Sequence, residues 1–212
     1  YCLLDPSFEF KDFSQIFTIS CPHIGVWIHP LVSLKAVSGR KAIYRIRRLR
    51  VAMDILSSMV EFSGGNPAKK TLGFLARPKE KGRYPAVIVI HEIWGLVDHI
   101  KDVASRLARE GYVALAVDLF EDAIVSKLEQ GREMREKFTE EKILGDLNGG
   151  FNYLKALDYV NPKRIGSMGF CMGGGLSLLL ACHNRELAAS VVFYGRSPSP
   201  IDLVKSVSCP IL

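Results

Sequence analysis

The sequence predicts an α/β fold in which a mainly parallel sheet carries helices on both faces. Four short runs are predicted to be core strands, and the first of them is apolar without alternation, which is typical of a strand that is covered on both sides. They lie at 86–90, 113–117, 164–170 and 189–194. Helical patterns separate these runs, and strands that alternate with helices form parallel sheets of this kind.

The first half of the pattern begins with a hairpin and continues with a strand–helix–strand unit. Glycines followed by Asn-Pro favour the hairpin turn. The helix has apolar side chains three and four positions apart and ends at Gly111. In chain order we expect a strand at 59–62, a turn at 64–67, a strand at 70–76, a buried strand at 86–90, a helix at 98–110 and a buried strand at 113–117.

The second half begins with a long helical stretch, 123–157, that is rich in Glu, Lys, Arg and Leu. Breaks are predicted at Gly131 and at Gly149-Gly150, because glycine is unfavourable inside helices. The elements expected after it are a turn at 161–162, a buried strand at 164–170, an apolar helix at 172–182, a buried strand at 189–194 and the first residues of a fifth buried strand at 209–212. In such sheets ligands bind at the carboxyl ends of the strands.

The composition excludes several classes of function. Of the net charge of +6, residues 1–52 hold +5, from eight basic and three acidic residues, and 53–212 hold only +1. The main body therefore offers no electrostatic case for a nucleic-acid partner. The five cysteines are scattered without a C-x-x-C motif, and the five histidines form no H-x-x-x-H pair. We expect no metal, no cofactor, no disulfide framework and a reducing, cytoplasmic location.

Residues 1–52 are predicted to be a basic N-terminal extension, and 53–212 a partial catalytic domain. The apolar stretch at 16–37 is interrupted by prolines, histidines and a lysine, so a membrane anchor is not expected. The basic run at 40–50 follows the apolar part, whereas a signal peptide has the reverse order. Our hypothesis is that Met53 is the native start, because the orderly pattern begins just after it.

Cys171 is the predicted nucleophile. It is the central residue of Gly169-Phe170-Cys171-Met172-Gly173, a G-x-nucleophile-x-G pattern between an apolar strand and an apolar helix. Such a turn presents the central side chain at its apex, and the positive end of the helix favours the reactive thiolate. The Met172 amide would face an oxyanion that develops on a substrate carbonyl. The alternative interpretation is a small buried cysteine beside a glycine-rich turn.

A second motif, His91-Glu92-Ile93-Trp94-Gly95, follows the first buried strand. In folds with such a nucleophile turn this loop supplies the other oxyanion N–H, here that of Ile93. Glu92 is a candidate partner that steers the Cys171 proton, and the alternative for it is a solvated loop acid. His91 is expected mainly to be a packing histidine.

With His-Glu-Ile-Trp-Gly-Leu, Val-Asp-Leu-Phe and Gly-Phe-Cys-Met-Gly-Gly in this order, the chain resembles the dienelactone hydrolase (carboxymethylenebutenolidase) family of the α/β-hydrolase superfamily. The resemblance implies a Cys-His-Asp hydrolase that acts on a small-molecule ester or lactone. It implies catalytic roles for Cys171 and Glu92 and oxyanion amides at Ile93 and Met172. It also implies that Trp94 and Tyr194 line the substrate pocket.

Two departures from the family pattern shape the functional prediction. Classical members carry a carboxylate-binding arginine shortly after the Asp-Leu-aromatic segment, where this chain has Glu121-Asp122. An acid there repels a carboxylate, which favours a neutral ester or lactone. The family's triad Asp and His follow the strand that 209–212 begin, and His183 is the last histidine here. We therefore expect a C-terminally truncated chain that is nearly inactive by itself.

Two alternatives remain open from the residues. One is a broader carboxylesterase or thioesterase on the same fold. The other is a non-catalytic protein of hydrolase fold that binds a ligand or a partner. The reactivity of the Cys171 thiol distinguishes the enzymes from the binding protein. The sequence does not indicate the oligomeric state.

Overall fold

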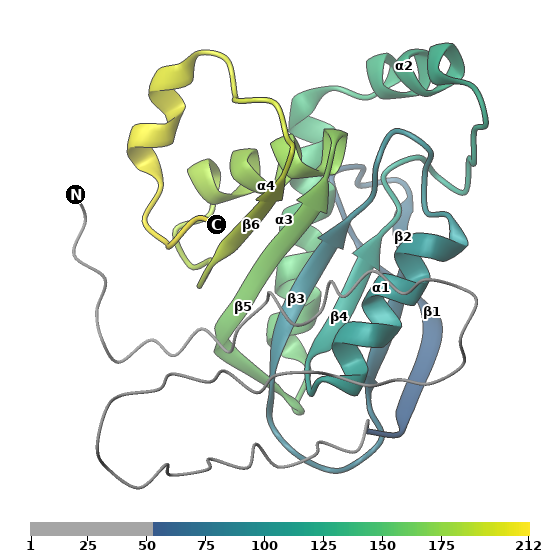
Figure 1. The fold of residues 1–212 in the computed structure, drawn as a ribbon, viewed down its shortest axis with the longest axis vertical. Helices are drawn as coiled ribbons and strands as arrows, with labels where there is room; N and C mark the ends of the chain where they lie inside the picture. The colour runs from purple at the N-terminus through teal and green to yellow at the C-terminus, as the bar shows by residue number, and fades with distance from the viewer. Residues whose placement is uncertain (1–52) are drawn as a thin grey trace, which may run out of the picture. The chain divides into compact units, whose positions relative to one another are not determined.

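The computed structural model describes residues 53–212 and confirms a mixed α/β fold with a mostly parallel sheet (Figure 1). The strand order is β1-β2-β4-β3-β5-β6. The strands are β1 (Ile55–Ser63), β2 (Lys70–Pro78), β3 (Tyr84–Ile90), β4 (Val113–Val117), β5 (Val160–Phe170) and β6 (Ser190–Phe193). The helices are α1 (Asp98–Arg109), α2 (Leu128–Lys137), α3 (Glu140–Ala156), α4 (Met172–His183) and the 3-10 helix η2 (Ile201–Ser206).

The predicted hairpin is present and longer than expected. Strands β1 and β2 pair antiparallel from Ile55 opposite Pro78 to Ser63 opposite Lys70. Strand β2 then pairs antiparallel with β4, whereas β4, β3, β5 and β6 run parallel. The hairpin therefore extends the parallel sheet on one side, and the other side is formed by β5 and β6, the strands before and after the nucleophile motif.

The carboxyl ends of the parallel strands meet at one edge of the sheet. Ile90 of β3 lies beside both Val117 of β4 and Gly169 of β5. Phe170, the last residue of β5, lies beside Phe193 of β6. Because these four strands end together, the loops that follow them converge, as the pattern of the sequence predicts.

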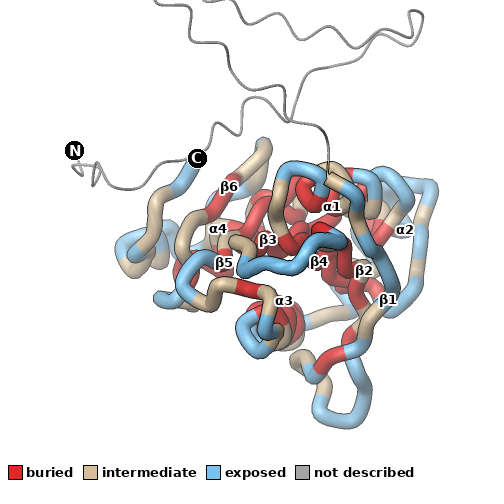
Figure 2. Tube along the Cα trace, turned by 90° about the horizontal axis from the view of Figure 1, so that it is seen from below, coloured by how far each residue is buried: buried red, intermediate tan, exposed pale blue. Residues whose placement is uncertain are grey.

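Helices cover both faces of the sheet (Figures 1 and 2). Helix α1 packs on one face through the buried residues that its spacing predicts, and α3 and α4 pack on the other. All five residues of β4 are buried, which accounts for its unbroken apolar sequence. Each large aliphatic side chain buried in this way contributes about 1.5–3 kcal/mol relative to its exposed state.

The predicted helix breaks at Gly131 and Gly149-Gly150 are wrong. Gly131 lies inside α2 and the glycine pair lies inside α3. The helical stretch breaks instead at Thr139, whose side chain accepts a hydrogen bond from the Lys142 amide and so caps α3. A Cβ at Gly149 would lie 2.2 Å from the carbonyl oxygen of Ser63, so this glycine provides close packing on β1 rather than a break.

Residues 209–212 begin to extend the sheet beyond β6. Ile211 forms a parallel bridge with Ser190, and the Leu212 amide donates to the Ser190 carbonyl at 3.0 Å. Within residues 53–212, no helix is long and apolar enough to cross a membrane. The predictions made for 1–52, including the domain division and the start at Met53, concern residues outside the described part and stay predictions.

Candidate active site

Cys171 occupies the sharp turn between β5 and α4. Its backbone has φ +52° and ψ −114°, a left-handed φ that a residue with a side chain rarely adopts. Its amide donates to the Phe193 carbonyl at 3.0 Å, and its carbonyl accepts from the Gly175 amide at 3.3 Å. These bonds to β6 and to the first turn of α4 hold the strained backbone, and the residue remains exposed.

Two glycines allow the turn to fit between neighbouring strands. A Cβ at Gly169 would lie 2.0 Å from the Gly173 carbonyl oxygen. A Cβ at Gly173 would lie 2.3 Å from the Ile90 carbonyl oxygen and 2.6 Å from that of His91. The two glycines of the motif are therefore required by main-chain contacts, and α4 begins directly against the end of β3.

The two predicted oxyanion amides belong to the loops on either side of this contact. Met172 is the first residue of α4, where an amide has no intrahelical acceptor. Ile93 follows β3, and its amide donates to no backbone carbonyl among residues 53–212. Since Gly173 lies against the Ile90 and His91 carbonyls, both amides are at the carboxyl edge of the sheet.

The carbonyl groups of Ile93 and Trp94 contact the segment 125–131, which includes the start of α2. A Cβ at Gly131 of α2 would lie 2.7 Å from the Ile93 oxygen, so this carbonyl packs directly on the helix. The Trp94 carbonyl accepts from the Val125 amide at 3.1 Å. The position that the sequence predicts to break a helix instead brings α2 onto the candidate oxyanion loop.

Glu92 and Tyr194 meet at the same edge although they are 102 positions apart. The Tyr194 hydroxyl donates to Glu92 Oε1 at 3.0 Å. The pKa of Tyr194 is raised, mainly by partial desolvation and further by the hydrogen bond to Glu92 and the charges of Glu92 and Cys171. Its hydroxyl therefore stays a donor. Tyr194 is 71% exposed and has φ +41°. Among the described residues the hydrogen-bond partner of the Glu92 carboxylate is Tyr194 and not Cys171.

His91 is completely buried beneath this loop and both of its ring nitrogens are engaged. Nε2 accepts from the Leu119 amide at 3.2 Å, and Nδ1 lies 2.5 Å from the Glu92 carbonyl oxygen. Its ring stands edge-on to Phe120 with centroids 5.0 Å apart. Burial lowers the pKa of His91, partly offset by the bond to Glu92, which keeps the imidazole neutral. The packing role predicted for this histidine is therefore present, with two specific bonds that the sequence does not reveal.

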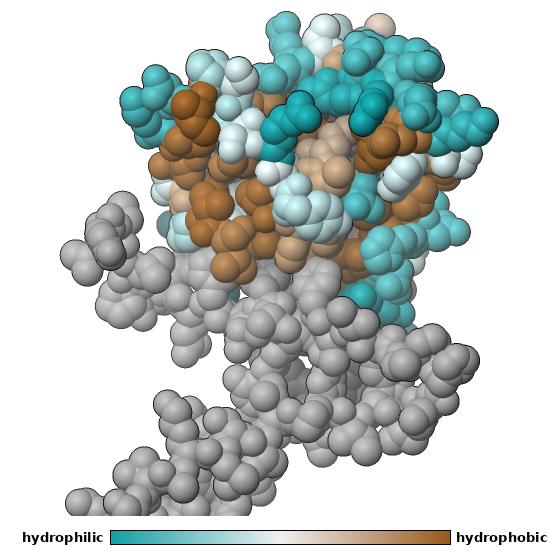
Figure 3. Space-filling view, turned by 45° about the horizontal axis from the view of Figure 1, so that its top comes forward, coloured by the Kyte–Doolittle hydropathy of each residue, from teal (hydrophilic) through white to brown (hydrophobic). Residues whose placement is uncertain are grey.

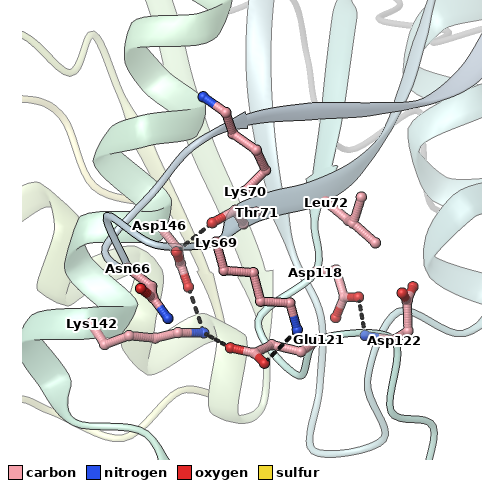
Figure 4. Close-up of a pocket in the computed structure, with 10 residues that line it drawn as sticks. All are labelled: Asn66, Lys69, Lys70, Thr71, Leu72, Asp118, Glu121, Asp122, Lys142 and Asp146. Atoms are coloured by element: carbon pink, nitrogen blue, oxygen red, sulfur yellow. Dashed lines mark hydrogen bonds and ion pairs between the residues drawn. The ribbon is translucent and has the colours of Figure 1, made fainter.

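Glu121, one of the two acids that the sequence analysis expects to repel a carboxylate, is paired with two lysines. Its carboxylate lies 2.7 Å from Lys69 and 3.3 Å from Lys142, and the hydrogen bond to Lys69 is the main cause of its lowered pKa (Figure 4). Two lysines balance its charge, so Glu121 does not by itself repel a substrate carboxylate. Asp122 is the second of these two acids. Its backbone amide donates to Asp118 Oδ2 at 2.6 Å, which closes a tight loop.

The buried end of this network is Asp146 of α3. Its Oδ1 accepts from the Gly65 amide at 2.9 Å and from the Thr71 hydroxyl at 2.6 Å. Its Oδ2 lies 2.9 Å from Lys142 Nζ but lacks hydrogen-bond geometry, so this contact is ionic. The network ties the hairpin turn to α3 and to the loop after β4, and the sequence pattern did not predict it.

Three buried serines join α4 to the strands on which it packs. The Ser177 hydroxyl lies 2.8 Å from the hydroxyls of both Ser167 and Ser190. These bonds connect α4 with β5 and β6, the two strands whose ends flank Cys171. No sequence signal marked these serines, because each lies alone in an apolar run.

Apolar and polar side chains share the surface around the strand ends, which Figure 3 turns toward the viewer. The parallel sheet, the strained residue at the strand–helix turn and the converging loops together define the α/β-hydrolase class. The model of the family described as "Dienelactone hydrolase family" matches residues 72–212. The chain belongs to the dienelactone hydrolase family.

Several similar proteins agree with this assignment. A protein of Saccharolobus solfataricus named "Putative carboxymethylenebutenolidase" is 38% identical over 185 residues, which cover 68% of each chain. A solved structure from Klebsiella pneumoniae, named "Putative Dienelactone Hydrolase", is 29% identical with a TM-score of 0.67 and covers 74% of this chain and 71% of its own. A dienelactone hydrolase-like promiscuous phosphotriesterase, P91 from metagenomic libraries, is 27% identical with a TM-score of 0.67, covering 74% and 66%.

The matches cover only part of several relatives. Two further curated relatives are matched over 61% and 53% of their own lengths. The family assignment and the fold therefore rest on the matched segment.

Proposed function

We propose that this protein is a hydrolase that cleaves a neutral ester or lactone and uses Cys171 as its nucleophile. The observation that carries the proposal is the backbone of Cys171. A left-handed φ at a residue with a side chain is costly, and such strain persists where the surrounding structure imposes it, often at functional sites. Here two main-chain bonds impose it and the thiol stays exposed at the N-terminal end of α4.

The neighbouring groups have complementary roles in this proposal. The thiolate attacks the substrate carbonyl carbon, and the amides of Met172 and Ile93 donate to the oxyanion that forms. Glu92 influences the ionisation of Cys171 and is itself oriented by the Tyr194 hydroxyl. Tyr194 and Trp94 line the position of the substrate.

The charges near the strand ends support a neutral substrate, for a reason different from the one that the sequence suggested. Lys69 and Lys142 both contact Glu121, so neither lysine is a free counterpart for a substrate carboxylate. Asp122 is exposed on the loop after β4, where a classical member of the family carries a carboxylate-binding arginine. A substrate carboxylate would find an acid there.

Thiol alkylation tests the nucleophile. In a background with Cys2→Ser and Cys21→Ser, we expect iodoacetamide to modify Cys171 at neutral pH well before Cys182 and Cys209. Burial raises the pKa of both of these thiols, which makes them internal controls. Cys171→Ser should remove the fast phase. A Cys171 that reacts as slowly as the two controls would support the non-catalytic binding protein instead.

Substrate charge is tested by acylation rates. With p-nitrophenyl acetate, a neutral ester, we expect release of one equivalent of p-nitrophenolate per Cys171. An ester of matched reactivity with a carboxylate on its acyl chain, p-nitrophenyl hydrogen glutarate, should acylate more slowly. Asp122→Asn should bring the acylation rates of the neutral and the anionic ester closer together. Faster acylation by the anionic ester would refute the neutral-substrate proposal.

Turnover is expected to be slow for the polypeptide of 212 residues. Among residues 53–212 no histidine hydrogen-bonds to Cys171. The nitrogens of His91 are both engaged, and His183 Nδ1 bonds to the Leu179 carbonyl at 2.9 Å. Without a general base, deacylation typically slows by several orders of magnitude. Full esterase turnover by this polypeptide would contradict the expectation.

A further inference from the structure

The orientation of one peptide group decides whether the Ile93 amide can serve the proposed reaction. The Ile93 N–H and the Glu92 C=O belong to the same peptide unit. The only cis bond among the described residues is Ser199-Pro200, so the unit between Glu92 and Ile93 is trans. In a trans peptide the N–H and the C=O point in opposite directions. Whatever holds the Glu92 carbonyl therefore also aims the Ile93 amide.

His91 holds that carbonyl. Its Nδ1 lies 2.5 Å from the Glu92 oxygen, and the ring is fully buried. The carbonyl is thus drawn inward, onto the buried ring, and the Ile93 N–H is directed away from it. The main chain of His91 also contacts the nucleophile turn, since a Cβ at Gly173 would lie 2.6 Å from the His91 oxygen. One residue therefore adjoins both halves of the candidate oxyanion site.

The loop after β4 determines which nitrogen of His91 carries the proton. The Leu119 amide donates to Nε2 at 3.2 Å, so Nε2 must be an acceptor and Nδ1 must carry the proton. In the other tautomer, Nε2–H would face the Leu119 N–H and Nδ1 would face the Glu92 carbonyl without a proton. Asp118 fixes this loop in turn, because its Oδ1 accepts from the Phe120 amide at 2.9 Å. Both bonds of His91 therefore demand the same tautomer.

We propose that His91 is a positioning residue that orients the 92–93 peptide, so that the Ile93 N–H faces the oxyanion formed at Cys171. This inference rests on the proposed function and adds to it a residue that never contacts the substrate. The neutral Nδ1–H tautomer, set by Leu119, is the form that performs the task. The end of β4 thereby contributes to the site through His91.

Comparing acylation with alkylation of Cys171 isolates this role. In acylation by p-nitrophenyl acetate, a C–S bond forms, the C–O bond to p-nitrophenolate breaks, and p-nitrophenolate leaves with the electron pair through an intermediate that carries an oxyanion. In alkylation by iodoacetamide, the thiolate displaces iodide and no oxyanion forms. A misdirected Ile93 amide therefore slows the first reaction and leaves the second unchanged.

Two substitutions of His91 separate its two bonds. His91→Asn places an N–H donor near the position of Nδ1 and keeps the bond to the Glu92 carbonyl. His91→Gln places its amide near the position of Nε2, where it can serve Leu119 but not Glu92. We expect His91→Gln to acylate about 10²-fold more slowly, comparable with removing one oxyanion donor. The acylation rate of His91→Asn should stay within about threefold of the parent rate, because this variant keeps the hydrogen bond to the Glu92 carbonyl. Both should alkylate at the parent rate.

The outcomes separate this inference from the proposed function. Equal acylation by His91→Gln and the parent, or an equal loss in acylation and alkylation, would overturn the positioning role. If the parent Cys171 alkylates slowly, the proposed function fails, and crystal structures of the two variants then decide the positioning role alone. We expect the 92–93 peptide to be rotated in His91→Gln and unchanged in His91→Asn. An unrotated peptide in His91→Gln would refute the inference whatever the chemistry.

Discussion

Replacing Gly173 with alanine should displace the nucleophile turn. The added Cβ would lie 2.3 Å from the Ile90 oxygen and 2.6 Å from the His91 oxygen, whereas ordinary contacts begin at 3.4 Å. The start of α4 must therefore move by roughly 1 Å, since the obstacles are main-chain atoms of a central strand and the loop that follows it. Overpacking of this kind costs about 1–3 kcal/mol, and the upper end applies to a rigid obstacle.

The expected decrease of about 3 kcal/mol in the free energy of unfolding corresponds to a fall in Tm of about 6–12 °C for a domain of this size. A misplacement of about 1 Å can also slow a reaction by about 10²-fold. Calorimetry would measure the first effect and acylation by p-nitrophenyl acetate the second.

Gly111→Ala is the matched control. Gly111 has φ +89°, but a Cβ there meets only Met53 Sδ at 3.7 Å. Its cost should be about 1–2 kcal/mol of backbone strain, and its position after α1 should leave acylation unchanged. If Gly173→Ala is as stable and as reactive as the parent, the reasoning about close packing at the turn is refuted.

Three further predictions concern stability. Asp146→Asn breaks a buried ion pair with Lys142 and should lower the free energy of unfolding in urea by about 3–5 kcal/mol. A change below about 1 kcal/mol would mean that the network is dispensable. Ser177→Ala leaves the buried Ser167 hydroxyl without a partner, whereas the Ser190 hydroxyl keeps its bond to the carbonyl of residue 177. The substitution should lower the free energy of unfolding by about 1–3 kcal/mol in the same urea experiment, and no loss would contradict a structural role. His91 has a folded pKa below its unfolded value of about 6.5, so its contribution to stability is complete above that pH and declines as the pH falls below it. The urea midpoint of the parent should therefore fall more steeply below pH 6.5 than that of His91→Asn, and parallel curves would exclude this linkage.

The elements of the fold were largely predictable because their signals are local. The residues of β4 are apolar without alternation, and their predicted bounds match the observed ones, Val113–Val117. The predicted helix breaks were wrong because the packing that places these glycines is not local. Glycine destabilises a helix locally, but Gly131 and Gly149 lie where a helix packs closely on Ile93 and Ser63. Those partners are distant in sequence, so no local pattern reveals them.

The same distinction applies to the candidate site. By itself the sequence determined the turn around Cys171, because a strand, two glycines and an apolar helix within a few positions leave the backbone little choice. Only the tertiary structure decided the surroundings of that turn. It balanced the charge of Glu121, joined Glu92 to Tyr194 across 102 positions, and seated His91 against Leu119 across 28. Such contacts depend on which strands end side by side, and that order arises only when the sheet is assembled.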